Sequence, residues 1–404
     1  MTSVSRIEPD LGFIQDLQKV GGLDLNKCYQ CATCSVICPI SPMDKPFPRK
    51  EMIWAQWGLK DKLVQDVDIW LCHKCGQCTE TCPRGAKPGE LMSALRNTAY
   101  QSLAGPKFLG RWMSSAKHLP KLIAIPAVIF LIVWLITGSI YGTPFPTPHG
   151  EIEFGYIFPG DFSIDPIFGL AALFVLYTFY RGISTMAKTF AQQPRTFVVG
   201  FHRPQSIWVS LWQVIKEEVL THKKWRDCGI EEPEETKFKG HIVLFYSFVA
   251  LFIVTSIVAL THWGGKVFGF LDMPYPMALW NPVKILANLG AIGLVVGLVY
   301  LTKRRLNATQ RDGSSFYDWY LLGTIWIVAL TGILSEIFRL LHVAGLAYIV
   351  YYLHLISVFM LIAYLPWSKL GHLVYRVVAL AHARRLGRVS TEIPTEQKNQ
   401  LYVL

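Results

Sequence analysis

The stretch CYQCATCSVICP at residues 28–39 returns in kind as CHKCGQCTETCP at residues 72–83. Both follow the spacing C-x2-C-x2-C-x3-C-P. In this pattern three closely spaced thiolates bind one [4Fe–4S] cluster, and the fourth cysteine, which precedes the proline, reaches the other cluster. The repeated pattern therefore predicts a helical, ferredoxin-like domain that wraps two [4Fe–4S] clusters.

The order of the cysteines assigns them to the two clusters. The first cluster is predicted to take Cys28, Cys31, Cys34 and Cys82. The second is predicted to take Cys72, Cys75, Cys78 and Cys38. A pair of zinc sites is the alternative, but tetrahedral zinc usually takes two C-x2-C pairs and needs neither the third cysteine nor the Cys-Pro step. Two clusters that lie close together indicate that this domain conducts electrons from one cluster to the other.

The composition places much of the remaining chain in a membrane. The chain has 404 residues, of which 52% are hydrophobic and 17% charged, whereas soluble domains carry about 25% charged residues. A soluble cysteine domain is predicted at 1–117, a membrane domain at 118–385 and a tail at 386–404. Six apolar runs are long enough to span, at 120–141, 165–184, 242–263, 283–302, 318–337 and 346–367. The predicted fold is all-α, with a six-helix transmembrane bundle after the cluster domain.

Basic residues orient the predicted bundle in the cytoplasmic membrane. The segments 181–240 and 303–317 and the tail after Trp367 hold ten, four and six Lys and Arg residues, whereas the opposite loops hold zero, two and one. By the positive-inside rule, both termini and the cysteine domain are predicted to face the cytoplasm. Met1–Asp10 lacks a signal-peptide pattern, which favours the same side. The net charge of +11 is thus attributed to inner loops, and no basic-aromatic stripe predicts binding to nucleic acid.

Two histidines bracket the end of the sixth span in HLISVFMLIAYLPWSKLGH, residues 354–372. Eighteen residues make five helical turns, so a continuous helix would project both rings to one side, about 27 Å apart. The third span likewise runs from His241 to His262. Because these spans are antiparallel, His241 is expected at the depth of His372, near the cytoplasm, and His262 at the depth of His354, near the outside. Opposed imidazoles at two depths predict that the bundle binds haem b. Two haems are expected, and at least one.

Each of these residues also has a structural interpretation. A histidine at the end of a span is often an interfacial residue, which applies most to His262, and His354 is alternatively a hydrogen-bonded core residue. His342 is the reserve ligand for the outer haem. Glu336, Arg339 and Lys284 are predicted either to assist proton release or to anchor span ends. In the fourth span, close helix packing and an opening for a porphyrin remain equally open for Gly290, Gly293 and Gly297.

The inner loop at 185–240 contains SIWVSLWQVIKEEVLTHKKW, residues 206–225. Its apolar residues recur at helical spacing against a charged face, which predicts an interfacial or docking helix. Five histidines in loops and tails are predicted to be solvated: His118, His149, His202, His222 and His382. Pro366 is predicted to bend the last turns of the sixth span so that His372 points inward.

The pattern of His354, Pro366, SKL at 368–370 and His372 resembles the gamma-subunit family of respiratory nitrate reductase. That resemblance implies a di-haem b membrane anchor that reacts with quinol. His241 matches an early histidine of another span in that family, but the family's second histidine, ten residues further on, falls here at Leu251. We therefore take His262 as the second ligand of the outer haem, because of its expected depth in the membrane and not because it matches the family's motif.

The cysteine domain resembles the C-subunit family of heterodisulfide reductases, and the bundle resembles the membrane E-subunit family of the same enzymes. The chain has no Cys-Cys pair and so lacks the CCG motif of disulfide-reducing relatives. The fusion of both parts is similar to the C-subunit family of the quinone-interacting membrane-bound oxidoreductase (Qmo) complexes. This resemblance implies cytoplasmic flavin-containing Qmo A and B partners, exchange with the menaquinone pool and an indirect link to adenylylsulfate (APS) reductase in dissimilatory sulfur metabolism.

The sequence thus predicts a subunit of a quinone-interacting oxidoreductase. It would exchange electrons between menaquinol and flavoprotein partners through haem b and the two clusters. Two alternatives stay open. One is a heterodisulfide-reductase-like or nitrate-reductase-like anchor with another soluble partner. The other is a membrane redox sensor that contains iron–sulfur clusters and no haem.

Overall fold

A computed structural model describes residues 8–41, 46–192, 205–222, 232–269, 276–307 and 315–386. Over these residues the regular secondary structure is helical, and no strand occurs among them. The all-α class predicted from the sequence is therefore confirmed. Of the predicted tail at 386–404, all but the first residue lies outside the described part.

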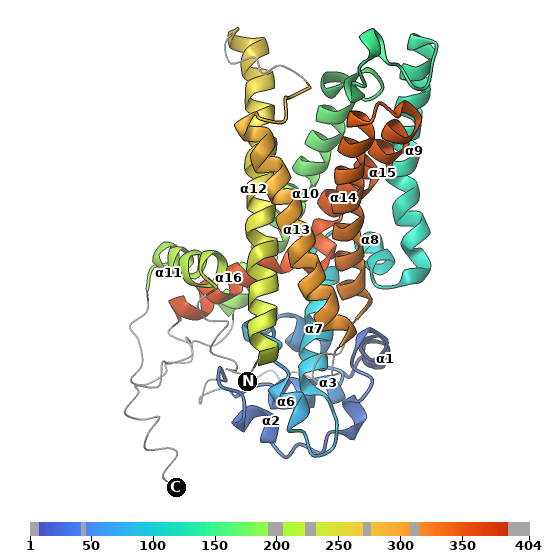
Figure 1. Ribbon diagram of the computed structural model, residues 1–404. Helices are drawn as coiled ribbons and strands as arrows, with labels where there is room; N and C mark the ends of the chain where they lie inside the picture. Colours follow the sequence, from blue (N-terminus) through green and yellow to red (C-terminus); the bar gives the residue numbers. More distant parts are fainter. Residues whose placement is uncertain are drawn as a thin grey trace.

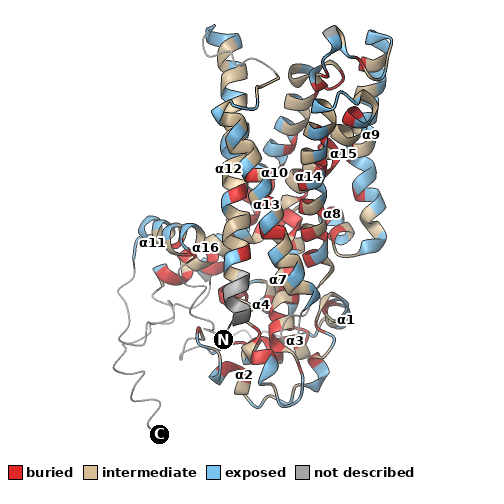
Figure 2. Ribbon diagram, in the orientation of Figure 1, coloured by how far each residue is buried: buried red, intermediate tan, exposed pale blue. Residues whose placement is uncertain are grey.

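A bundle of long apolar helices forms one half of the molecule (Figure 1). Six helices of the described chain are long and apolar enough to cross a membrane. They are α9 (Leu119–Tyr141), α10 (Asp165–Gln192), α12 (Glu232–Phe268), α13 (Pro282–Leu306), α14 (Phe316–Leu340) and α15 (Ala344–Ala363). Each coincides with a predicted span. Exposed stretches run along these helices (Figure 2), and the exposed residues include large apolar ones such as Leu135 and Ile140. The chain is a multi-pass membrane protein.

The glycine stripe of α13 serves close packing of two helices. A Cβ atom on Gly297 would lie 2.9 Å from the backbone nitrogen of Leu244 on α12, and one on Gly290 would lie 3.1 Å from Cγ of Leu251. Gly293 likewise meets Ser247. Of the two interpretations left open by the sequence, the structure supports packing, because α12 fills the stripe.

The sixth span ends earlier than the apolar run suggested. Helix α15 stops at Ala363, and two 3-10 turns (Leu365–Trp367 and Lys369–Gly371) separate it from α16 (His372–Arg385). Pro366 lies in the first of these turns. Because proline has no backbone N–H, it cannot donate the hydrogen bond that would continue α15. A continuous helix from His354 to His372 therefore does not form, and the chain breaks around Pro366, where the sequence predicted a bend. Helix α16 instead runs across the bundle (Figure 1), so the two rings do not share a helical face.

The predicted cysteine domain consists of short helices, most of which lie below the bundle (Figure 1). They are α1 (Leu11–Val20), α2 (Thr33–Val36), α3 (Arg49–Gln56), α4 (Lys60–Val64), α5 (Asp68–Leu71), α6 (Gln77–Glu80), α7 (Pro88–Leu103) and α8 (Lys107–Met113). Their core continues into the bundle: the ring of Trp70 lies 5.6 Å from that of Tyr100 and 6.0 Å from that of Tyr375 on α16. The two predicted domains share one apolar core, and the division near residue 118 stays a prediction.

Candidate cluster and haem sites

The four cysteines predicted for the second cluster line a single cavity. Cys72, Cys75 and Cys78 approach it from the loop before α6 and from α6 itself, and Cys38 approaches from the loop after α2. Lys74 and Gly76 have positive φ angles of 54° and 84°. This backbone turns the loop sharply enough to aim closely spaced sulfurs at one point. The structure thus brings together the set that includes Cys38, which lies 34 residues or more before the others.

The cysteines predicted for the first cluster also lie together. The electrostatic neighbours of Cys34 are Cys28, Cys31 and Cys82, and burial is the main cause that raises the Cys34 pKa to about 11. Burial likewise raises the pKa of Cys38 to about 12. None of the eight described cysteines forms a disulfide. Buried, neighbouring thiols of this kind become thiolates by exchanging their protons for a metal, which is the chemistry of a cluster ligand.

His241 and His372 line one cavity at the end of the bundle that is predicted to be cytoplasmic. His241 belongs to α12, and His372 is the first residue of α16. Apolar side chains form most of the remaining wall: Val219, Phe245, Leu373, Val377 and Leu380. The structure therefore unites the two histidines that the sequence paired for the inner haem.

The imidazoles have the chemistry that haem iron requires. Nδ1 of His372 lies 2.7 Å from the carbonyl oxygen of Lys369 and donates to it, which leaves Nε2 as the coordinating nitrogen. Burial lowers the His372 pKa to about 4, so the ring stays neutral at pH 7. Arg376 adds a positive charge at the cavity wall. These donors and walls fit a haem b bound by two histidines.

His222 is a residue of this site that sequence reasoning missed. It was predicted to be solvated, and that prediction is wrong: the residue is 3% exposed, and its Nε2 lies 3.0 Å from Nδ1 of His241. It follows α11 (Ile207–Val214) and a π-helical turn (Ile215–Leu220). One face of this segment is buried at four-residue intervals, by Ser210, Val214, Glu218 and His222. That spacing was the available signal, but the large apolar side chains of the opposite face concealed it.

The outer histidine His354 borders a second cavity. Thr331 Oγ1 lies 3.1 Å from His354 Nδ1, and the cavity wall includes Tyr351 and Gly332. Charged side chains also line this cavity: the Nζ of Lys284 lies 2.8 Å from a carboxylate oxygen of Glu336, and Arg339 is a further lining residue. Among the described residues that line this cavity there is no second histidine.

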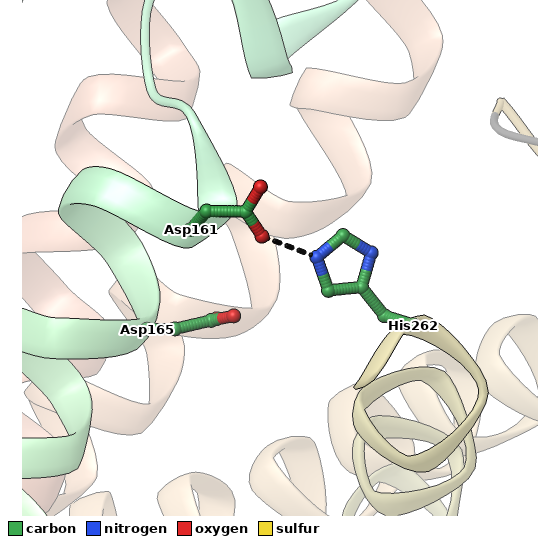
Figure 3. Close-up of side chains that lie close together, drawn as sticks. All are labelled: Asp161, Asp165 and His262. Carbon is green, nitrogen blue, oxygen red and sulfur yellow. Dashed lines mark hydrogen bonds and ion pairs between the residues drawn. The ribbon is translucent and has the colours of Figure 1, made fainter. Parts of the chain in front are cut away.

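His262 occupies a different place near the outer end of α12. Its Nε2 lies 2.6 Å from Oδ1 of Asp161, which also pairs with Lys266, and Asp165 stands beside them (Figure 3). The His262 side chain is 42% exposed. The structure does not bring His262 to the cavity of His354, so its role as the second outer ligand stays a prediction. Leu251, where a second histidine was sought by resemblance, packs on Gly290.

Two contacts join the inner histidine site to the second cysteine site. Arg376 lies one turn after His372, and its guanidinium donates to the carbonyl oxygen of Trp70 and lies 2.9 Å from Nδ1 of His73, the neighbour of Cys72. A second contact centres on the buried Asp318 of α14. It pairs with Lys74 of the cluster loop at 3.5 Å, with Arg305 at 3.4 Å and with Lys369 of the turn before His372.

Comparison with known proteins places both halves of the chain. A family model described as 4Fe-4S dicluster domain matches residues 24–86. A second model, described as citrate utilization protein B, matches residues 165–392, which is more than half of the chain. The chain belongs to the citrate utilization protein B family. In this member of the family, the matched region covers α10 to α16 and therefore all four histidines predicted as haem ligands.

Curated relatives of this family member belong to heterodisulfide reductases. It is 36% identical over 91 residues to the C-subunit of the H(2):CoB-CoM heterodisulfide,ferredoxin reductase of Methanothermobacter marburgensis, covering 22% of the chain and 49% of the relative. It is 32% identical over 131 residues to the C2-subunit of the H(2)/formate:CoB-CoM heterodisulfide,ferredoxin reductase of Methanococcus maripaludis, covering 30% and 68%. It is 26% identical over 150 residues to the E-subunit of the dihydromethanophenazine:CoB–CoM heterodisulfide reductase of Methanosarcina mazei, covering 35% and 57%.

The chain spans about half the length of the first of these relatives. No solved structure matches it. The dicluster model and the clustered cysteines support two [4Fe–4S] clusters. Together with the six helices that are long and apolar enough to cross a membrane, they identify a membrane-linked iron–sulfur protein.

Proposed function

We propose that this chain exchanges electrons between menaquinol in the membrane and flavin-containing proteins in the cytoplasm. One observation carries the proposal. The cavity of His241 and His372 and the cysteine cavity of the second cluster are joined by Arg376, which contacts Trp70 and His73 directly. A haem in the histidine cavity and a cluster in the cysteine cavity would therefore be separated by one packed layer of protein.

The ligand assignments are part of the proposal, and the cavity of His241 and His372 and the cysteine cavity of the second cluster support them. His241 and His372 hold the inner haem b, and the eight motif cysteines hold the two clusters in the sets assigned from their order. Haem b supplies a one-electron carrier between a two-electron quinol and the one-electron clusters. His354 holds the outer haem, and His262 is its partner only if the outer end of α12 moves.

The outer cavity suits exchange with quinol. It combines an aromatic wall at Tyr351 with the hydroxyl of Ser335 and the Glu336–Lys284 pair, so a quinol hydroxyl would meet a carboxylate as proton acceptor. The positive-inside pattern supports an orientation in which this end lies outside the cytoplasm and the cysteine domain, with both termini, lies inside it. Protons would then leave outward while electrons pass inward.

The proposed partners are of the Qmo A and B type and link the chain to APS reductase. The fusion of a part similar to the C-subunit with a part similar to the E-subunit, together with the absence of a Cys-Cys pair, supports this choice. A partner of heterodisulfide reductase type is the second candidate, because the curated relatives carry that name. Co-purification separates the two. Flavoproteins whose complex with this chain reduces APS reductase support the first, and disulfide-reducing partners support the second.

The proposal as a whole is tested by a pyridine haemochrome assay with iron and labile-sulfide counts on the same purified chain. Two haems or one with about eight cluster irons agree with it. Cluster iron without haem would favour the membrane redox sensor, and stoichiometric zinc would refute the cluster assignment.

A further inference from the structure

His222 is held against His241 by contacts from two separate helices. The hydroxyl of Tyr246 on α12 donates to the carbonyl oxygen of Leu220 at 2.8 Å. From α16, Arg384 pairs with Glu217 at 2.6 Å. The segment α11 with its π-helical turn is thereby fixed at both sides of the histidine cavity, and its last buried residue is His222.

The surroundings of His222 fix the direction of its ring. The ring lies 5.4 Å from that of Phe245 at an interplanar angle of 62° and 5.0 Å from that of His241. The backbone at His222 has a φ of 50°, a left-handed conformation that residues other than glycine adopt at a cost. A conformation of this kind, held by contacts on both sides, indicates that the position of the imidazole matters.

We infer that His222 is a positioning residue that accepts a hydrogen bond from Nδ1–H of His241 and so directs Nε2 of His241 to the haem iron. This inference rests on the proposed function, in which His241 is an axial ligand. The opposite direction of donation would place the proton of His241 on Nε2, where it would block coordination. The 3.0 Å contact between the rings also leaves no room for a porphyrin between them, so His222 and His241 do not bind one iron from opposite faces.

The two histidine ligands of the inner site are then oriented in different ways. His372 donates to a backbone carbonyl, whereas His241 donates to an imidazole nitrogen. An acceptor on the distal nitrogen makes a histidine ligand more electron-rich, which favours the oxidised iron. Because His222 ends the segment that begins with α11, a protein docking on α11 would act on the haem through this one bond.

The experiment compares His222→Ala, His222→Gln and the wild type in the full chain. Lys216→Ala, an exposed side chain on the same turn, is the matched control. Haem content is measured by pyridine haemochrome, and the ligation is read from low-spin EPR signals. The ratio of reduced to oxidised haem is measured in a redox titration in which each haem is followed by its own EPR signal. Removing a hydrogen-bond partner of a metal ligand typically changes metal affinity or activity about 10- to 100-fold.

We expect His222→Ala to keep its haem and a low-spin signal, with the ratio of reduced to oxidised inner haem raised about tenfold at a fixed potential, which is about 59 mV for one electron. The side-chain carbonyl introduced by His222→Gln can accept the same hydrogen bond, so this variant should return the ratio of reduced to oxidised haem most of the way to the wild-type value. Loss of haem or a high-spin signal in His222→Ala would make His222 itself a ligand and overturn the inference. So would a titration identical to that of Lys216→Ala. A wild type without haem would refute the proposed function itself.

Discussion

Replacing Asp318 with asparagine tests how the cluster loop is held on the membrane bundle. The side chain of Asp318 is 1% exposed and pairs with three cations, Lys74, Arg305 and Lys369. Ser315 donates to the same carboxylate through its backbone nitrogen and its hydroxyl, each at 3.0 Å. One carboxylate thus balances charges from the cluster loop, from the end of α13 and from the turn before His372.

Asparagine keeps the shape of the side chain and removes its charge. Three neighbouring cations are then left without their common anion, and breaking a buried ion pair in this way costs about 3–5 kcal/mol. The amide oxygen still accepts from Ser315, so the loss of the helix cap adds little. At roughly 2–4 °C per kcal/mol for a large domain, the thermal midpoint should fall by about 10 °C.

The assay is thermal unfolding of the purified chain in detergent, with Asp16→Asn as the matched control. Asp16 forms a pair with Lys19 at 3.1 Å in which the side chains are 75% and 72% exposed, and exposed pairs contribute about 0–1 kcal/mol. Adding Lys369→Met to Asp318→Asn should recover part of the loss, because it removes one stranded charge. If Asp318→Asn lowers the midpoint no more than Asp16→Asn does, the buried pairing does not hold the two parts together.

Three further predictions concern packing, pH and the clusters. Gly182→Ala places a Cβ atom 2.5 Å from the hydroxyl of the fully buried Tyr375 and should cost about 1–3 kcal/mol, whereas Gly169→Ala on the same helix meets nothing within 4 Å; equal melting of the two variants would show that α10 adapts. Burial, reinforced by Asp66 and Asp68, raises the pKa of Glu51 well above its usual value even though Lys50 opposes this effect. The folded state therefore binds a proton that the unfolded state loses above about pH 4.3, and stability contributed by Glu51 declines as the pH rises through the window between the two pKa values. Glu51→Gln should flatten the fall of the thermal midpoint as the pH rises above about 4.3, and an unchanged slope would contradict the assignment. Cys38→Ala should lower cluster iron from about eight to about four atoms per chain, while Cys228→Ser, outside the motifs, should leave the iron count unchanged; equal counts in both variants would argue against Cys38 as a ligand.

Strong local patterns made much of the architecture predictable. Each predicted span coincides with a helix, because an apolar run of this length has no other stable conformation in lipid. The cysteine spacing likewise anticipated that Cys38 would cross to the second motif, where the structure places it. In both cases the information lies within a short stretch of sequence.

What the sequence did not predict depends on contacts between distant segments. A bend at Pro366 was predicted, but continuous hydropathy past Ala363 concealed that two tight turns end the helix there and that a separate helix begins at His372. His222 looked solvated because it is followed by charged residues, and only the docking of α11 on α16 and α12 buries it. His262 was placed by depth along the membrane, but depth does not fix which neighbour a ring meets, and Asp161 is that neighbour.

The central claim is that electrons pass from quinol through the inner histidine site to the clusters. The most direct measurement is the rate at which a menaquinol analogue reduces the [4Fe–4S] clusters of the full chain in lipid nanodiscs, followed by stopped-flow absorbance and freeze-quenched EPR. Reduction by dithionite verifies that each variant holds both clusters. The account predicts rapid reduction in the wild type and at least a hundredfold slower reduction in His372→Ala, as about 2.7 kcal/mol or more of added barrier implies. Clusters that quinol reduces equally fast without His372 would contradict it.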